Sequence, residues 1–336
     1  MERRAQGPTS REKVGYRYGV GRRRLDGLRL GRRPASSHPL RGEPVPTCCH
    51  EHGLHRRPPA NRGPYTRRMA RLEDVRAVVT GATSGLGAAM ARALLAEGAR
   101  VAIAARPTPR LETTVAQCRQ ADLAAEPLPL DVRDPRSVQA AADEIRARWG
   151  GLDLLVNNAG IGMRTVNPRF LEAPQPFWEV LPEGFSDLIA TNLTGYFLVA
   201  RAFVPLFLAA RRGRIVNVTM NRETMRRQGF VPYGPSRAGA EALSMIMAED
   251  LRPYGVSVNL LLPGGATDTG MIPVNTSASA RGGLLSPDVM GPPIVFLASP
   301  EAEGVTGQRI VARDWQRWLA EFSSARRDSG GPLAPV

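Results

Sequence analysis

The sequence predicts one doubly wound α/β domain with a mainly parallel, seven-stranded sheet. From Val75 onward, apolar runs of strand length alternate with longer segments of helical periodicity. The runs are continuously apolar, as expected for parallel strands that are buried on both faces. The first run ends in a glycine-rich turn that leads directly into a helical segment, as in domains built from strand, turn and helix units.

The expected elements follow one another in the same rhythm to the end of the domain. We expect strands at Arg76–Thr80, Arg100–Ala104, Pro127–Leu130, Leu152–Val156, Arg214–Val218, Val256–Leu261 and Arg309–Val311. We expect helices near Gly85–Glu97, Arg110–Gln120, Asp134–Trp149, Glu183–Arg211, Gly234–Arg252 and Pro287–Leu297. Because such sheets bind ligands outside the carboxyl ends of their strands, the turns after the strands are where we look for a site.

The charge of the chain is concentrated at its N-terminus. The 336 residues are 43% hydrophobic and carry a formal net charge of +14. Residues 1–70 contain 16 arginines and Lys13 against five acidic residues, which accounts for +12 of that charge. This segment is rich in Arg, Pro and Gly and has no lasting periodicity, so we expect a disordered basic arm.

We divide the chain into this arm, a domain at 71–314 and a C-terminal tail at 315–336. Met69 is expected to be the natural start, with the upstream residues mis-assigned or dispensable. An Arg-rich arm that touches nucleic acid is the alternative, but we expect no nucleic-acid partner because the remaining chain is nearly neutral.

Cysteine and histidine usage bounds the compartment and the chemistry. Three cysteines cannot form a disulfide framework in a chain of this size, which favours a reducing compartment. The cluster Cys48, Cys49, His50, His52 and His55 does not match tetrahedral zinc spacings, and we expect no metal site. No apolar run of about 18 to 20 residues and no secretory signal is evident, so we expect a cytoplasmic protein without a membrane partner. All four histidines lie in the arm, which excludes Ser-His or Cys-His hydrolysis within the domain.

The turn after the first expected strand has the composition of a phosphate-binding turn. It reads Thr80-Gly81-Ala82-Thr83-Ser84-Gly85-Leu86-Gly87 and opens a helical run. Glycines let the backbone approach a pyrophosphate closely, and the amides at the helix N-terminus meet its charge.

Tyr233 and Arg237 are the candidate acid–base pair. They are four residues apart at the start of an expected helix, so their side chains lie on one face, as suits a phenol that moves protons.

Together these motifs resemble the short-chain dehydrogenase/reductase family, from about Val75 to Asp314. The likeness rests on Thr-Gly-x-x-x-Gly-x-Gly, on Asn157-Asn158-Ala159-Gly160 after the fourth strand and on Tyr233-x-x-x-Arg237. It is also carried by Asn192 in Thr191-Asn192-Leu193-Thr194-Gly195, by Asp131 after the third strand and by Pro263-Gly264 after the sixth. The resemblance implies a Rossmann-type fold and a nicotinamide dinucleotide cofactor.

The resemblance assigns cofactor contacts by position. The implied contacts are Thr80, Gly81, Ser84, Gly85, Leu86 and Gly87 at the pyrophosphate, Asp131 and Val132 at the adenine, Asn158, Ala159 and Gly160 on the cofactor-side wall, Tyr233 and Arg237 at the ribose and nicotinamide, and Pro263, Gly264 and Thr267 near the carboxamide. The second strand ends at Arg106, with no acidic residue to meet a ribose 2′-hydroxyl. A cation there suits a 2′-phosphate, which favours NADP over NAD.

The resemblance also implies the chemistry. The family's tyrosine passes a proton to or from the carbonyl or alcohol oxygen while hydride moves. A phenol with a pKa of about 10 needs a neighbouring positive charge for this, and the family normally supplies a lysine. Arg237 keeps the charge but is bulkier and cannot pass a proton, so we expect lowered but non-zero activity.

The hydroxyl that normally holds the substrate carbonyl falls thirteen residues before Tyr233, at Met220. A thioether cannot donate a hydrogen bond to a developing oxyanion. We therefore consider its neighbours Thr219 and Asn221 for this role, with a slight preference for Asn221. Asn192 is expected to hold a relay water, as in the family; the alternative is an asparagine that satisfies only local backbone groups.

Two hypotheses follow for the whole chain. The first is an NADP-dependent oxidoreductase acting on a small-molecule carbonyl or alcohol. The second is a related cofactor-binding protein that has lost turnover and serves as a binding or scaffolding subunit. We expect Gly270 to Ser286 to form a mobile substrate lid, and Phe170 to Pro182 either to wall a hydrophobic pocket or to serve packing. The expected helices Glu183–Arg211 and Gly234–Arg252 suggest a homodimer or homotetramer by family analogy.

Overall fold

The computed structural model describes residues 71–273 and 277–329. The expected disordered arm, with its Cys and His cluster, lies outside these residues. All of the elements described below belong to the unit that follows Pro64.

Seven strands form one sheet in which every neighbouring pair is parallel. They are β1 (Arg76–Thr80), β2 (Arg100–Ala105), β3 (Ala125–Pro129), β4 (Leu154–Asn157), β5 (Gly213–Val218), β6 (Val256–Leu262) and β7 (Arg309–Val311). The predicted fold class is confirmed, and the sheet is wholly rather than mainly parallel. The order β3-β2-β1-β4-β5-β6-β7 reverses direction between β1 and β4, which makes the carboxyl ends of these two strands the topological switch point where such folds bind ligands.

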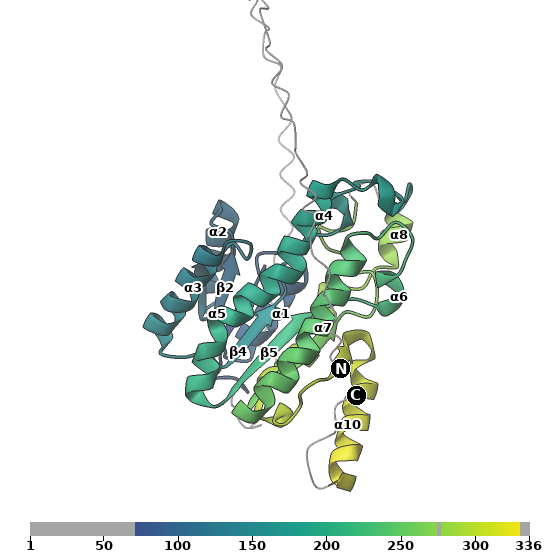
Figure 1. The fold of residues 1–336 in the computed structure, drawn as a ribbon. Coiled ribbons are helices and arrows are strands. Elements are labelled where there is room, and N and C mark those ends of the chain that lie inside the picture. Colours follow the sequence, from purple (N-terminus) through teal and green to yellow (C-terminus); the bar gives the residue numbers. More distant parts are fainter. Residues whose placement is uncertain (1–70, 274–276, 330–336) are drawn as a thin grey trace, which may run out of the picture. The chain divides into compact units, whose positions relative to one another are not determined.

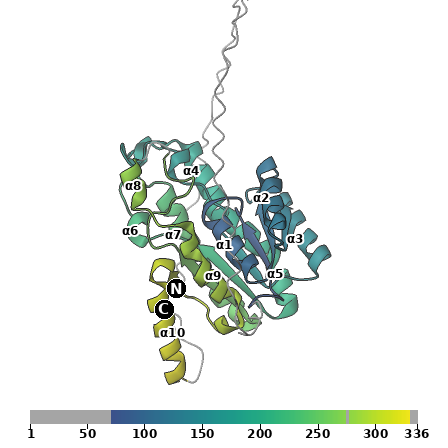
Figure 2. The same ribbon diagram turned by 180° about the vertical axis from the view of Figure 1, so that it is seen from behind.

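The helices cover both faces of the sheet. The longer ones are α1 (Gly85–Ala96), α2 (Pro109–Gln120), α3 (Pro135–Trp149), α4 (Pro182–Ile189), α5 (Gly195–Ala210), α7 (Tyr233–Leu251) and α9 (Gly291–Ala298). Short helices α6 (Arg222–Met225) and α8 (Ala278–Gly282) lie in loops. Helices α5 and α7 cover the face of the sheet that is turned to the viewer in Figure 1. Helices α1 and α9 cover the opposite face, which is turned to the viewer in Figure 2.

Each face has its own apolar core. One core joins Met90 and Leu94 of α1 to Ile294 of α9, and the other joins Val138 of α3 to Phe203 of α5. Because both faces of the strands are buried, the strand sequences are continuously apolar, as predicted.

The helix expected at Glu183–Arg211 is interrupted. Helix α4 passes into a π-helical turn at Ala190–Thr194 before α5 begins. The combined span Pro182–Ala210 is long and apolar enough to cross a membrane by length and composition, which corrects our expectation that no such run exists. Here α5 packs against α3, β4 and β5, and Val199, Phe203 and Phe207 of this helix lie in the core of the domain, whereas Phe197 is exposed.

Part of the expected C-terminal tail is a helix. Helix α10 (Trp315–Ser329) brings Trp315 and Phe322 onto Phe296 of α9, at ring-centroid distances of 5.2 and 5.5 Å. Trp318 stacks on both of its α10 neighbours. These rings extend the core on the α1 and α9 face, which is a packing role that the sequence analysis did not anticipate.

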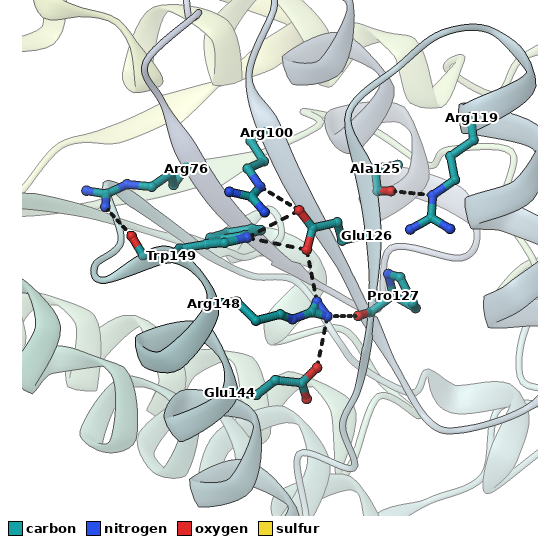
Figure 3. Close-up of polar contacts among 9 residues, drawn as sticks. All are labelled: Arg76, Arg100, Arg119, Ala125, Glu126, Pro127, Glu144, Arg148 and Trp149. Atoms are coloured by element: carbon teal, nitrogen blue, oxygen red, sulfur yellow. Dashed lines mark hydrogen bonds and ion pairs between the residues drawn. The ribbon is translucent and has the colours of Figure 1, made fainter.

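A charged network fixes the outer strand β3 to α3 (Figure 3). Glu126 accepts hydrogen bonds from Arg100, from Nη1 of Arg148 at 2.9 Å and from Nε1 of Trp149 at 3.3 Å. The Arg100 guanidinium also lies 4.9 Å from the centre of the Trp149 ring. Burial opposes ionisation of Glu126, but Arg100, Arg148 and Trp149 together hold the pKa of this carboxyl below its ordinary value.

This network predicts a pH-dependent contribution of Glu126 to stability. Because the pKa is lower in the folded state, the carboxylate stabilises the fold above the unfolded pKa of about 4.3, and this contribution is lost as pH falls through the folded value. We expect Glu126→Gln to lower the free energy of unfolding by about 1 to 2 kcal/mol at neutral pH, allowing for partial solvent exposure. Urea unfolding of both proteins at neutral and acidic pH measures the difference.

Glu144→Gln is the matched control, since Arg148 is the one ion-pair partner of Glu144 among the described residues and the Glu144 side chain is 40% exposed. It should cost less than about 0.5 kcal/mol. If the difference in free energy of unfolding between Glu126→Gln and the unaltered protein did not become smaller at acidic pH, the stabilising role of the Glu126 carboxylate would be contradicted.

Candidate active site

The glycine-rich turn is locked to the segment that follows β4. Thr80 Oγ1 donates to the Val156 carbonyl at 3.1 Å and accepts from the backbone amides of Asn158 and Ala159, at 2.9 and 3.0 Å. The Asn158 side-chain amide donates back to the Thr80 carbonyl at 2.9 Å. The two motifs, 77 residues apart in sequence, therefore form one rigid floor at the switch point.

The glycines of this turn are required by conformation and by space. Gly81 and Gly85 have φ values of +66° and +55°, which lie in the left-handed region. A Cβ on Gly81 would lie 2.8 Å from the Ala159 Cα, and one on Gly87 would collide with the Asn158 amide. Close packing thus explains two of the three glycines without any ligand.

The start of α1 nevertheless fits a dinucleotide. Helix α1 begins at Gly85 with no side-chain cap and no acidic residue in its first turn, so its free amides and positive dipole end are available to an anion. A cavity of about 580 Å³ opens beside it. The cavity is lined by Thr83, Ser84 and Gly85, by four arginines (Arg92, Arg110, Arg164, Arg281) and by the loop from Asp268 to Ile272. The residues present therefore fit a pyrophosphate group.

Arg106 follows β2 at the same edge of the sheet. Its side chain is exposed and, within residues 71–273 and 277–329, it makes no hydrogen bond or ion pair. Asp131, after β3, accepts from the Arg133 backbone at 3.0 Å and pairs with its guanidinium at 3.4 Å. Burial opposes ionisation of Asp131, but Arg133 and the charge of Arg106 hold its pKa below its ordinary value. Arg106 is thus a cation near Asp131 that has no hydrogen-bond or ion-pair partner among the described residues. Val132, the residue after Asp131, is buried and packs beside Gly195.

Tyr233 and Arg237 lie one turn apart at the start of α7, as their spacing predicts. The Arg237 Cζ lies 5.4 Å from the centre of the Tyr233 ring. The guanidinium is only 3% exposed. Its Nη1 donates to Tyr196 Oη at 2.7 Å and to the Val218 carbonyl at 3.0 Å, while its Nε is buried without a partner among the residues described.

Burial shapes the charges in this cluster. Burial opposes the charge of Arg237, yet the oxygens of Tyr196 and Tyr233 keep its pKa above its ordinary value. Burial raises the pKa of the Tyr196 phenol, although Arg237 acts in the opposite direction. The cluster therefore holds a permanent cation beside a neutral, buried phenol.

Asn192 lies in the π-helical turn and is fully buried. Its side chain accepts from the Ile161 amide and donates to the Ile161 carbonyl, both at 2.9 Å, and it also donates to Ser236 Oγ at 3.2 Å. The amide group thus joins the wall after β4 to the first turn of α7. These bonds reach residues 31 and 44 positions away and include a side chain, so they are not limited to local backbone groups. The relay-water role of Asn192 stays a prediction.

Met220, in the loop before α6, and Tyr233 each pack against one apolar cluster, which contains Phe230 and Met163. Thr219, by contrast, is buried, and its hydroxyl donates to Glu241 Oε1 at 2.9 Å. The Thr219 proton is therefore committed away from the phenol, which argues against Thr219 as the carbonyl donor.

Asn221 precedes α6 as its N-cap residue and makes no side-chain cap hydrogen bond. It is partly exposed, and no contact joins it to Tyr233 within the described part of the chain. The Tyr233 hydroxyl instead donates a hydrogen bond to the Met271 sulfur, at 4.0 Å.

The loop after β6 approaches the same edge. Gly264 has a φ of +93°, and the Pro263 carbonyl accepts from the Arg313 amide at 3.1 Å. Thr267 forms an isolated parallel bridge with Leu285. Arg281 of the predicted lid forms an ion pair with Asp268, two residues before the lid begins, at 2.7 Å. This pair connects the later part of the lid to the segment that leads into it.

The segment before α4 divides into a packed part and an exposed part. Phe170 is buried and meets Phe230 edge to face at 5.7 Å. Phe177 and Trp178 are 67% and 72% exposed. Packing therefore accounts for the first part and not for the second.

Three residues of the site were missed by the sequence analysis. Tyr196 lies four residues after Asn192, and Glu241 lies four after Arg237, so helical spacing was the available signal. Glu241 also accepts from Arg309 Nε at 3.0 Å, and Arg309 Nη2 donates to the Met220 carbonyl at 2.7 Å. This pair fixes the loop that carries Met220.

Comparison with known proteins agrees with this geometry. A family model described as short chain dehydrogenase matches residues 76–279. A 3-oxoacyl-(acyl-carrier-protein) reductase of Vibrio cholerae is 33% identical over 249 residues, covering 71% of this chain and 96% of the relative. A putative ketoacyl reductase of the monensin polyketide synthase of Streptomyces virginiae is 34% identical over 257 residues, covering 70% and 94%. Among solved structures, a gluconate 5-dehydrogenase of Burkholderia cenocepacia with NADP and tartrate superposes with a TM-score of 0.65 at 29% identity, covering 74% of this chain and 98% of that one.

Proposed function

Because this chain belongs to the short-chain dehydrogenase family and is an oxidoreductase of that type, we propose that it interconverts a carbonyl and an alcohol with NADP. The bound nicotinamide would supply or accept the hydride. Tyr233 would donate a proton to the carbonyl oxygen in reduction and accept it from the alcohol in oxidation.

One observation carries this proposal. The segment after β4 is hydrogen-bonded to the glycine-rich turn at Asn158, and two residues later Gly160 packs directly on the Arg237 guanidinium. A continuous set of contacts thus joins the expected pyrophosphate position to the pair formed by Tyr233 and Arg237. This arrangement supports a cofactor that lies across the floor with its reactive end beside the phenol.

The surroundings of Tyr233 support an apolar substrate. Met163, Phe170 and Phe230 form a buried cluster with Met220 against the phenol, and the Met271 sulfur lies on its hydroxyl side. Methionine side chains are flexible enough to adapt to irregular apolar shapes. We therefore propose a carbonyl compound with apolar substituents.

The first test is turnover by Tyr233→Phe. The full-length chain should consume NADPH with at least one member of a panel of ketones, aldehydes and quinones. Losing the proton donor should lower that rate by about 100-fold or more, while NADPH binding, measured by fluorescence, changes by less than about threefold. Tyr254→Phe, at an exposed tyrosine, is the control. Equal rates for Tyr233→Phe and the unaltered chain would refute the role of the phenol.

Arg106 supports the choice of NADP. An exposed cation after β2 that has no partner in the part of the chain that the structure describes suits a 2′-phosphate, and the solved relative from Burkholderia cenocepacia contains NADP. We expect Arg106→Ala to weaken NADPH binding about tenfold, the loss of one charge-assisted hydrogen bond, and to leave NADH binding unchanged. Arg201→Ala, on the exposed side of α5, should alter neither. An equal loss for both cofactors would overturn this assignment.

The alternative is a binding or scaffolding subunit that retains the cofactor site without turnover. Met220, where the family has a hydroxyl, and Arg237, where it has a lysine, favour this alternative. The combined change Met220→Ser and Arg237→Lys should raise the rate of NADPH consumption about tenfold or more if the site is a weakened enzyme, because a hydroxyl would stabilise the developing oxyanion. No gain in a double variant that still binds NADPH would favour the subunit.

We also propose a cytoplasmic homodimer or homotetramer. Phe197 on α5 and Ile246 on α7 are 45% and 60% exposed, and exposed apolar side chains on these helices support self-association. Light scattering on the purified chain measures the oligomeric state directly, and a monomer would rule this out.

A further inference from the structure

Arg237 lies close to two tyrosine rings. Its Cζ lies 5.5 Å from the centre of the Tyr196 ring and 5.4 Å from that of Tyr233. Tyr196 is 2% exposed and comes from α5, whereas the proposed acid–base phenol stands at the start of α7. Contacts of this kind between a cation and aromatic faces are stronger when water is excluded.

The Tyr196 hydroxyl makes one hydrogen bond as donor and accepts another from Arg237. It donates to the Val218 carbonyl at 3.1 Å and accepts from Arg237 Nη1 at 2.7 Å. The same Nη1 donates to that carbonyl at 3.0 Å, which closes a three-membered polar cluster. A buried guanidinium that lost one of these partners would leave a charged donor unsatisfied in addition to Nε.

This cluster sets the plane of the guanidinium. With Nη1 anchored, Nη2 lies against Gly160, where an added Cβ would collide with it and lie 3.0 Å from Asn192 Oδ1. Asn192 fixes the Ile161 backbone, and Tyr196, one helical turn later, fixes Arg237. Asn192 therefore holds the segment after β4, and Tyr196 holds the Arg237 guanidinium that faces this segment.

We propose that Tyr196 is a positioning residue that adapts the site to arginine at 237, orienting Nη2 toward the ribose side of the cofactor. This proposal rests on the proposed function. A lysine side chain is one bond shorter than arginine, so we expect its ammonium to stop short of the Tyr196 hydroxyl. The role of Tyr196 is thus tied to Arg237 and is not a general packing role.

The test is a double-mutant cycle of Tyr196→Phe and Arg237→Lys, measured by NADPH fluorescence titration. With Arg237 present, Tyr196→Phe should raise the dissociation constant about tenfold, because the cation loses its anchor. In the Arg237→Lys background the same change should alter it by less than about threefold. Equal effects in both backgrounds would mean that Tyr196 acts on the fold alone and would overturn the proposal.

Thermal unfolding of the four proteins without cofactor separates this proposal from the proposed function. Tyr196→Phe should lower Tm by several degrees with Arg237 and by clearly less in the Arg237→Lys background; additive shifts would overturn the anchoring. If none of the four binds NADPH, the proposed function fails, while the unfolding cycle still reports on the anchor. Far-UV circular dichroism checks folding, and Arg237→Gln serves as the second background if the lysine variant does not fold.

Discussion

The site depends on the hydrogen bonds of one threonine side chain. Thr80, the last residue of β1, bonds to the end of β4 and to two amides of the turn that follows it. These bonds place the glycine-rich turn and the Asn158–Gly160 wall at a fixed separation across the switch point. Every other group of the site is positioned against this floor: Gly160 meets Arg237, Asn192 holds Ile161, and the start of α7 closes the side.

Arginine at 237 imposes the second constraint. A guanidinium has five donors and a delocalised charge, and burying it is costly unless these groups find partners. The fold meets this demand at Nη1 with Tyr196 and the Val218 carbonyl, while Nε is buried without a partner among the described residues. The neighbouring Gly160 leaves room for the guanidinium, since a Cβ at this position would collide with Nη2.

Sequence reasoning reached the parts of the structure that local pattern determines. The apolar runs gave the seven strands to within about two residues, because burial on both faces leaves a continuous signal. The motifs after β1 and β4 were expected to meet, because the carboxyl ends of parallel strands share one edge. The π-helical turn at Asn192 was missed because its five residues, Ala190–Thr194, contain neither a proline nor a glycine to mark a break in the helix. The orientation of Thr219 toward Glu241 was missed because a loop residue's direction is set by partners from distant elements, here α7 and β7.

The network around Glu126 has a consequence for how this protein tolerates change. Arg100 is the first residue of β2 and Glu126 the second of β3, whereas the reactive groups of the site follow the carboxyl ends of the strands. Free-energy effects of changes that share no partners are close to additive. Thermal stability can therefore be engineered at one edge of the sheet while new substrate specificity is selected at the other. Such separation makes the scaffold a suitable starting point for directed evolution.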